Sequence, residues 1–182
     1  MSITQGRLKA TVMDGEQIRR SLSRIAHEIL ERNRGADDLV LVGVMARGDV
    51  LAARLADRIE ELEGRPVEVG ALDPSGHRDD RGHSPPARRP PSRVPPIDGK
   101  VVILVDDVIW HGRTVRAAMD ALIEFGRARA IQLVVLVDRG HRELPIRPDY
   151  VGKNLPTRRD EAVDVNEEGV DLGDMINDRR PR

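Results

Sequence analysis

The hydrophobic residues of this chain fall into two kinds of segment, short continuous runs and longer stretches with helical spacing. The continuous runs cover residues 39–44 and 101–105, a third at 131–137 is interrupted only by Gln132, and residues 67–72 give another short strand. Runs of this kind are typical of strands that are buried on both faces of a sheet. The segments after the first two runs carry apolar residues every three or four positions, as amphipathic helices do. The pattern therefore predicts strand–loop–helix units of an open α/β sheet.

Further residues indicate where the helices begin and end and where weaker strands are expected. Asp14 is a suitable N-cap for the first helix, and Gln17 three residues later gives a pattern close to a capping box. We expect this helix to end near Gly35. Weak alternation predicts an edge strand at 7–13, short strands at 150–154 and 162–165, and either an edge hairpin or a frayed tail at 166–182. The apolar positions of the three helices are Ile18, Leu22, Ile25, Ala26, Ile29 and Leu30, then Leu51, Leu55, Ile59 and Leu62, then Val115, Ala118, Met119, Leu122 and Ile123.

Residues 73–99 differ in composition from the rest of the chain. They hold most of the prolines and several arginines, and they have very few apolar side chains. Such a segment cannot contribute much to a packed core, so we expect a long mobile loop whose length suggests function or disorder. His77 and His83 lie in it, but no further residue has the spacing of a metal site.

In the stretch 101–114, the strongest strand signal of the chain is followed by a loop whose residues are of types that bind ligands. Asp106 and Asp107 follow the apolar run, where the strand is expected to leave the core, and Gly112-Arg113-Thr114 leads into a helix. A loop that presents backbone N–H groups at a helix N-terminus can hold a phosphate. Adjacent carboxylates can hold hydrated Mg²⁺ or the hydroxyl groups of a sugar. A general metal-binding strand end, as in receiver domains or nucleotide hydrolases, is the alternative.

Two further loops are expected beside this one. Met45-Ala46-Arg47-Gly48 follows the strand at 39–44, and residues 138–142 follow the strand at 131–137. Loops gather at the carboxyl ends of the strands in an open α/β sheet, so these loops should line one crevice. Arg47 would meet an anionic ligand there, or else form a surface salt bridge.

Composition narrows the class of protein. A chain of 182 residues suits one domain, and its net charge of −1 does not indicate a general nucleic-acid binder, so any basic surface must be local. The absence of cysteine excludes disulfides and thiolate metal sites. The sequence has neither a signal peptide nor an apolar run of membrane-spanning length, so we expect a cytoplasmic protein with no membrane partner. Trp110, Phe125 and Tyr150 are the only aromatic residues apart from histidine, which leaves little scope for base stacking.

The motifs of the chain resemble those of a known family. The apolar run, the acid pair, two apolar residues and then Gly112-Arg113-Thr114 are similar to the ribose-phosphate signature of type I phosphoribosyltransferases. A more specific resemblance is carried by residues 136–157, with 23–29, 72–73 and 78–80, and covers nearly the whole chain. These residues resemble the pyrimidine operon regulators, the PyrR family, whose members bind mRNA and are also uracil phosphoribosyltransferases.

The resemblance implies a fold and a reaction. The chain would be a single domain over residues 1–182 with the type I phosphoribosyltransferase fold, an α/β fold whose open, mostly parallel central sheet is flanked by helices. Residues 73–99 would form a flexible hood over the site, and the protein would be a homodimer or homotetramer. The reaction would join uracil to phosphoribosyl diphosphate (PRPP), giving UMP and diphosphate, with Mg²⁺ bound together with PRPP.

The resemblance also assigns roles to residues by position. Asp106 and Asp107 would hold the ribose hydroxyls with Mg²⁺ nearby, and Arg47 would meet the diphosphate, which makes these three the candidate catalytic residues. The loop 108–114 would take the 5-phosphate, and residues 137–139 would border the uracil. The residues implied in binding PRPP or UMP are Ala46, Arg47, Gly48, Arg78, Asp79, Asp106, Asp107, Val108, His111, Gly112, Arg113, Thr114, Val137, Asp138 and Arg139.

The family further implies binding of pyrimidine-gene leader mRNA in response to the uridine nucleotides UMP and UTP. The residues it implies lie off the apolar stripe of the first helix or after the fourth core strand, so burial does not account for them: Ser23, Arg24, His27, Arg32, Arg142, Arg147 and Lys153. A solvated helix face is the alternative for the helical members. With few aromatic side chains, RNA affinity is expected to come from phosphate and hairpin-shape contacts and to depend strongly on salt.

Several positions around the candidate site depart from the family pattern. Ala46 replaces a threonine, His77 replaces a tyrosine, and Trp110-His111 stands where the family has tyrosine or serine followed by a small hydroxyl residue. Each lost hydroxyl donor would weaken phosphate binding by about 0.5–1.5 kcal/mol. Three functions stay open: the bifunctional regulator and enzyme, an RNA-binding regulator with weakened or lost transferase activity, and a phosphoribosyltransferase for another base without an RNA role.

Overall fold

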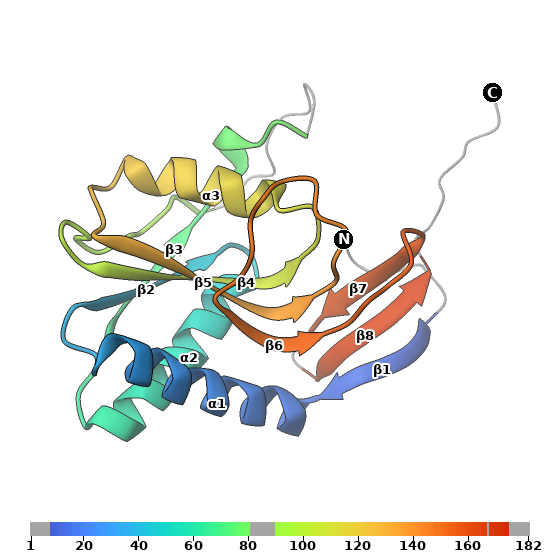
Figure 1. Ribbon diagram of the computed structural model, residues 1–182, viewed down its shortest axis with the longest axis horizontal. Coiled ribbons are helices and arrows are strands. Elements are labelled where there is room, and N and C mark those ends of the chain that lie inside the picture. The colour runs from blue at the N-terminus through green and yellow to red at the C-terminus, as the bar shows by residue number, and fades with distance from the viewer. Residues whose placement is uncertain (1–7, 81–89, 167, 175–182) are drawn as a thin grey trace.

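The computed structural model describes residues 8–80, 90–166 and 168–174, and its centre is a five-stranded parallel sheet (Figure 1). The strand order is β3-β2-β4-β5-β6, and each neighbouring pair is parallel. The open parallel sheet predicted from the apolar runs is therefore confirmed. Its strands are β2 (Leu39–Val44), β3 (Glu68–Leu72), β4 (Val101–Ile109), β5 (Ala130–Asp138) and β6 (Tyr150–Asn154).

Helices cover both faces of this sheet. The helices α1 (Gly15–Asn33) and α2 (Gly48–Glu63) lie on one face, and α3 (Arg113–Ile123) lies on the other with the short 3₁₀ helix η1 (Ser75–His77) (Figure 1). Alternate strand residues enter opposite cores: Leu41 and Ile103 pack with α1 and α2, whereas Val40 and Val102 pack with α3. No helix in these described ranges is long and apolar enough to cross a bilayer.

The start of α1 confirms the predicted capping box. The Asp14 side chain accepts a hydrogen bond from the Gln17 backbone N–H at 2.7 Å, and the Gln17 side chain accepts one from the Asp14 N–H at 2.9 Å. The helix ends at Asn33, and the left-handed residues Arg34 and Gly35 follow it. Its end was therefore predicted to within two residues.

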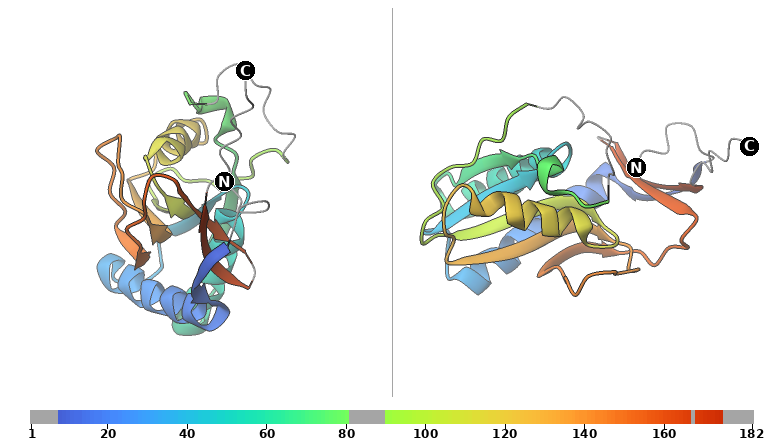
Figure 2. Two further views of the ribbon diagram at one scale, coloured as in Figure 1. Left: turned by 90° about the vertical axis from the view of Figure 1, so that its right-hand side faces the viewer. Right: turned by 90° about the horizontal axis from the view of Figure 1, so that it is seen from above.

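A second, antiparallel sheet stands beside the carboxyl end of the large sheet (Figures 1 and 2). Its order is β1 (Leu8–Asp14), β8 (Gly169–Asp174), β7 (Glu161–Val165). The weak strand expected at 7–13 is confirmed as β1. For the segment from residue 166, the hairpin alternative holds and fraying is wrong as far as Asp174, because β8 pairs with both β1 and β7 and is the middle strand. Residues 175–182 lie outside the described ranges.

The segment 73–99, called the hood segment below, is only partly separate from the core. Arg93 forms a bridge with Ala71 at the edge of β3, and the Asp73 backbone N–H donates to the Ser92 hydroxyl at 2.9 Å. Ile97 is fully buried in the core beneath α3. In the described part of this segment, Ile97 is therefore the exception to the expectation that the segment adds little to the core. Residues 81–89 lie outside the described ranges.

Two glycines bring the start of α2 against β2 and β4. A Cβ on Gly48 would lie 2.3 Å from the Val105 carbonyl oxygen, and one on Gly43 would lie 2.3 Å from the Asp49 Cα. Only residues without a side chain allow backbones to approach this closely. The loop after β2 is consequently held next to Asp106.

Candidate active site

A cavity of about 620 Å³ opens at the carboxyl end of the large sheet, where the crevice was expected. The loops after β2 and β4, the start of the hood segment and Arg139 after β5 surround it, and Val163 of β7 closes the side toward the small sheet. Most of the predicted substrate-binding residues line it: Ala46, Arg47, Arg78, Asp106, Asp107, Val108, His111, Gly112, Arg113, Thr114 and Arg139.

Four predicted residues do not line this cavity. Gly48 lies behind it against β4, and Val137 is fully buried in the core with α1 and α2. Asp79 points to Arg113 at the rim, and Asp138 accepts a hydrogen bond from Arg142 at 2.6 Å. Of the residues expected to border uracil, Arg139 is the one whose position at the cavity the structure supports.

The acid pair lies within β4 rather than beyond its end. The strand continues to Ile109, because Val108 pairs with Val137 and Ile109 with Asp138 of β5. The prediction that the strand leaves the core before the carboxylates is therefore wrong. Asp106 is only 5% exposed, and its Oδ1 accepts the Asp107 backbone N–H at 2.9 Å.

Asp106 and Asp107 differ in burial, and burial changes the pKa of Asp106. Removal from water raises the pKa of Asp106 well above its usual value, and the charge of Asp107 adds to the effect. Asp107 is more exposed, and its Oδ1 accepts the Val108 N–H at 2.7 Å. A carboxyl group that holds its proton more tightly can donate to a ribose hydroxyl, and the carboxyl oxygens of the pair can accept from one.

The loop after β4 turns at Gly112, whose φ of 91° favours glycine and which is the N-cap of α3. No side chain caps this helix start, so its first amides are available to a ligand such as a phosphate. Before the glycine, the rings of Trp110 and His111 stack at 3.7 Å, and the guanidinium of Arg139 lies over the Trp110 ring at 4.5 Å. The two departures from the family pattern thus form one aromatic unit at the wall of the cavity.

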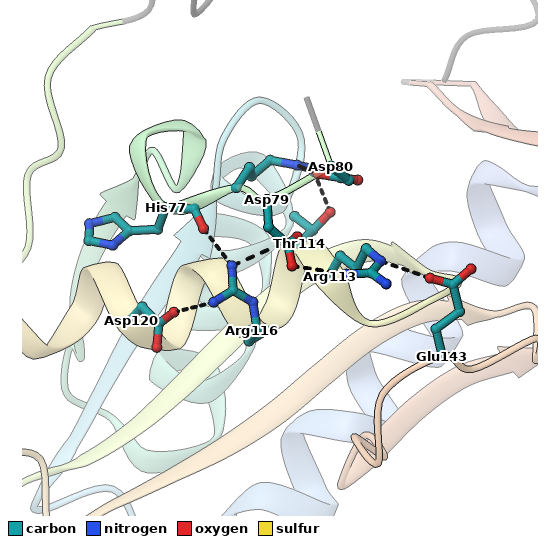
Figure 3. Close-up of polar contacts among 9 residues, drawn as sticks. His77, Asp79, Asp80, Arg113, Thr114, Arg116, Asp120 and Glu143 are labelled. Carbon is teal, nitrogen blue, oxygen red and sulfur yellow. Dashed lines mark hydrogen bonds and ion pairs between the residues drawn. The ribbon is translucent and has the colours of Figure 1, made fainter. Parts of the chain in front are cut away.

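The beginning of the hood segment is fastened to the start of α3 (Figure 3). Arg78 donates to the Thr114 hydroxyl at 2.5 Å, and Arg113 donates to Asp79 at 2.9 Å. Arg116 donates to the carbonyl oxygen of His77 at 2.6 Å. Hydrogen bonding to Arg78 lowers the pKa of Asp80, which keeps this carboxylate charged. The Thr114 hydroxyl and the Arg113 guanidinium, both expected at a bound phosphate, are therefore engaged by protein groups.

The cation expected to meet the diphosphate is held by a residue that the sequence did not indicate. Arg47, the N-cap of α2, donates to Asp164 Oδ1 of β7 at 2.6 Å and lies 3.9 Å from Asp107 Oδ2. The strand at 162–165 was predicted, and a charged residue between its two buried valines was the signal that could have drawn attention to Asp164. The peptide bond between Met45 and Ala46 in the same loop is cis.

Comparison with known proteins decides the family. Residues 10–172 match the model described as a phosphoribosyl transferase domain. The chain is 59% identical over 174 residues to the bifunctional protein PyrR of Brevibacillus brevis, an alignment covering 94% of this chain and 97% of that protein. It is 57% identical over 169 residues to the bifunctional protein PyrR of Pelotomaculum thermopropionicum, covering 91% and 92%. The chain belongs to the PyrR family.

Solved structures give the same fold for this PyrR-family chain. A hypoxanthine-guanine phosphoribosyltransferase from Bacillus anthracis superimposes with a TM-score of 0.69 at 22% identity, covering 93% of this chain and 99% of that chain. A hypoxanthine phosphoribosyltransferase from Staphylococcus aureus gives a TM-score of 0.66 at 19% identity, covering 93% and 94%. The predicted type I phosphoribosyltransferase fold is therefore confirmed.

The donor set of the cavity suits a magnesium ion that arrives with a ligand. In the ranges that the structure describes, no three His, Cys, Asp or Glu residues are grouped so as to hold a metal by themselves. Mg²⁺ keeps several waters and is usually bound through one or two carboxylates plus substrate phosphates. Asp107, with Asp106 behind it, fits that pattern.

The residues predicted to bind RNA in this PyrR-family chain lie along α1 and β6 and in the loop before β6. Arg24 donates to the carbonyl oxygens of Val151 and Gly152, each at 2.9 Å, which fixes α1 to β6. Arg32 pairs with Asp149 at 2.6 Å, and Lys153 donates to the Val12 carbonyl oxygen at 3.1 Å. We call Arg24, His27, Arg32, Arg147 and Lys153 the basic surface; His27 and Arg147 are exposed members of it, and the neighbouring Ser23 is half-buried.

Arg142 is directed differently from the other residues of that set. Its guanidinium donates to Asp138 at 2.6 Å and to the Trp110 carbonyl oxygen at 2.9 Å, and its side chain is only 20% exposed. It therefore ties the loop after β5 to the loop after β4. The structure assigns it a place next to the cavity wall rather than on the basic surface.

Proposed function

We propose that this protein is a uracil phosphoribosyltransferase that forms UMP and diphosphate from uracil and PRPP, and a regulator that binds the leader mRNA of pyrimidine genes in response to UMP or UTP. The enzymatic part rests on one cavity. It is lined by the acid pair, by the start of α3, which no side chain caps, and by Arg47. Membership of the PyrR family carries the regulatory part.

In this proposal the cavity works by placing charges around PRPP. Asp106 and Asp107 bind the ribose hydroxyls, and the amides after Gly112 bind the 5-phosphate at the positive end of α3. Arg47 meets the diphosphate, which leaves with negative charge as the ribose becomes positive. Asp107, with Asp106 beside it, would hold Mg²⁺ bound together with PRPP, and the ion would supply positive charge against the departing diphosphate. The protein therefore contributes mainly position and electrostatics to the reaction.

The hood contacts must rearrange for this chemistry. Arg78 and Arg113 are engaged with Thr114 and Asp79, so a phosphate at the start of α3 has to share or replace these partners. The base would lie toward Arg139 and the Trp110–His111 pair, on the side of the cavity where Val163 also lies. Val137 and Asp138 can reach such a base only through their backbone, because their side chains are directed elsewhere.

The regulatory part rests on the basic surface. Its side chains lie on α1, on β6 and in the loop before β6, and a hairpin that spans these elements would meet Arg24, Arg32, Arg147 and Lys153 together. A regulator with weakened transferase activity is the second candidate, because Ala46 and His111, which line the cavity, stand where the family has hydroxyl donors. His77, the third departure, does not line the cavity, and its ring lies 3.0 Å from Glu124 instead. The expected cytoplasmic location and the homodimer or homotetramer remain predictions.

One pair of measurements tests the proposal. Purified protein with Mg²⁺ and PRPP is assayed for nucleotide formation from uracil, hypoxanthine and guanine, and its binding to the leader hairpin is measured with and without UMP. We expect UMP from uracil alone among these bases, and tighter hairpin binding with UMP. Nucleotide formation from a purine base without hairpin binding would contradict the proposal, and hairpin binding without turnover would favour the second candidate.

A further inference from the structure

One arginine of the cavity, Arg47, is paired with a carboxylate from outside the large sheet. Arg47 donates to Asp164 at 2.6 Å, and Asp164 belongs to β7 of the small sheet, 117 residues further along the chain. The side chain of Asp164 is 15% exposed and that of Arg47 is 38% exposed, so the pair is partly shielded from water. Asp107 lies 3.9 Å from the same guanidinium nitrogen. One positive charge therefore faces two carboxylates.

We propose that Asp164 sets the affinity of this site for diphosphate groups by competing with them for Arg47. This inference rests on the proposed function for the identity of the ligand, PRPP and its product diphosphate. A carboxylate and a diphosphate oxygen make the same kind of charge-assisted hydrogen bond to a guanidinium. PRPP therefore gains Arg47 only by replacing or sharing Asp164.

Asp164 is placed to compete for Arg47, and the residues next to it in the small sheet are not. Asp171 lies opposite Asp164 in the pairing of β7 with β8, but its carboxylate accepts from Thr11 at 2.9 Å and from Asn166 at 3.0 Å. The residues beside Asp164, Val163 and Val165, are buried and apolar. The small sheet thus presents one carboxylate to Arg47 and directs the next one elsewhere.

Competition for Arg47 affects both the binding of PRPP and the release of diphosphate. Before binding, the Arg47–Asp164 pair lowers the positive potential that an anionic ligand meets, which weakens the capture of PRPP. After the reaction, the Asp164 carboxylate can pair with Arg47 again, and this favours release of the diphosphate. Uracil carries no diphosphate, so its binding is not expected to depend on Asp164.

The test compares Asp164→Asn with Asp171→Asn. Both changes remove one negative charge from neighbouring strands of the small sheet, but only the first removes the carboxylate that accepts the 2.6 Å hydrogen bond of Arg47. For Asp164→Asn we expect the KM for PRPP and the inhibition constant of diphosphate to fall together by about fivefold, the order of one partly exposed ion pair, with the KM for uracil unchanged. Asp171→Asn should change none of them. An unchanged or raised KM for PRPP, or an equal effect of Asp171→Asn, would overturn the inference.

A binding experiment separates this inference from the proposed function. Titration of diphosphate with Mg²⁺ into the protein by calorimetry needs no base and no turnover, so it measures the effect of Asp164 even if uracil is not the substrate. In an Arg47→Gln background, Asp164→Asn should no longer tighten diphosphate binding, because the competed cation is absent. Persistence of the full effect in that background would contradict competition for Arg47. Asp164→Thr, which suits a strand, serves if the asparagine variant does not fold.

Discussion

The cavity and the basic surface both use charged side chains, but they place them in opposite environments. In the cavity, Asp106 is buried and its pKa is raised, and Arg139 is almost fully buried with its pKa lowered by the same loss of water. On the basic surface, Arg24 and Arg32 are about half exposed. Charged groups withdrawn from water carry strong, local electrostatic effects, whereas exposed ones are screened by salt. The two regions should therefore respond separately to substitution.

The largest effect is expected from the acid pair. Asp106→Asn combined with Asp107→Asn should lower the turnover of PRPP by about 100-fold or more, because the ribose and the developing positive charge lose their partners. RNA binding should be unchanged, since the pair lies in the cavity. Turnover is measured with saturating uracil, and folding is checked by thermal unfolding.

The chain offers a matched control for this double change. Asp37 and Asp38 are also adjacent carboxylates before a strand, but they are exposed and pair with Arg65 and Arg129 at the surface. The double variant Asp37→Asn/Asp38→Asn should keep full turnover. Undiminished turnover in the folded Asp106→Asn/Asp107→Asn protein would show that the site is wrongly placed.

The second prediction addresses the basic surface. Arg147→Gln combined with Lys153→Gln should weaken binding of the leader hairpin about tenfold at moderate salt and flatten its salt slope by about 0.7–0.9 per lost phosphate contact. Turnover of uracil should barely change. Gel shifts over a range of salt concentrations measure both quantities.

The comparison variant removes the same charge outside the basic surface. Lys100 precedes β4 and pairs with Glu68 of β3, and Arg127 precedes β5, so neither belongs to the basic surface and Lys100→Gln/Arg127→Gln should leave hairpin binding nearly unchanged. Equal weakening by both double variants would indicate a general charge effect rather than a surface formed by α1 and β6.

The third prediction uses the raised pKa of Asp106. Because the folded state holds this proton more tightly than the unfolded chain, folding stability falls as the pH rises above about 4, where an unfolded Asp loses its proton. Asp106→Asn removes that dependence and should raise the free energy of unfolding near pH 7 by about 1 kcal/mol. Urea unfolding at pH 4, 5.5 and 7 measures it. A variant that is less stable than the wild type at pH 7 would contradict the assigned cost of burying this group.

The open parallel arrangement of the large sheet could be predicted from the sequence. For the small sheet, strands at 7–13 and 162–165 and a hairpin from residue 166 were among the expectations, but the pairing of these strands with one another was not. The strands β2, β4 and β5 are continuous apolar runs, a signal that is local in the chain. The strand β8 alternates glycine and acidic residues with single apolar ones, and its register depends on partners as distant as Thr11 and Asp171. The pairing of Arg47 with Asp164 depends on the same long-range contact. Sequence patterns thus located the acid pair and the loops, but not the carboxylate that faces them from the other sheet.

The smallest effect is expected at His111, a departure from the family pattern at the phosphate loop. Its ring stacks on Trp110, and its Nε2 lies 3.8 Å from Glu143, so the ring is directed toward protein groups and offers a phosphate less than a hydroxyl group would. His111→Thr should lower the KM for PRPP about threefold, because one hydroxyl donor is gained. His27→Gln, which removes an exposed imidazole of the basic surface, should leave this KM unchanged; if His111→Thr matches the wild type, the ring of His111 does not face the ligand.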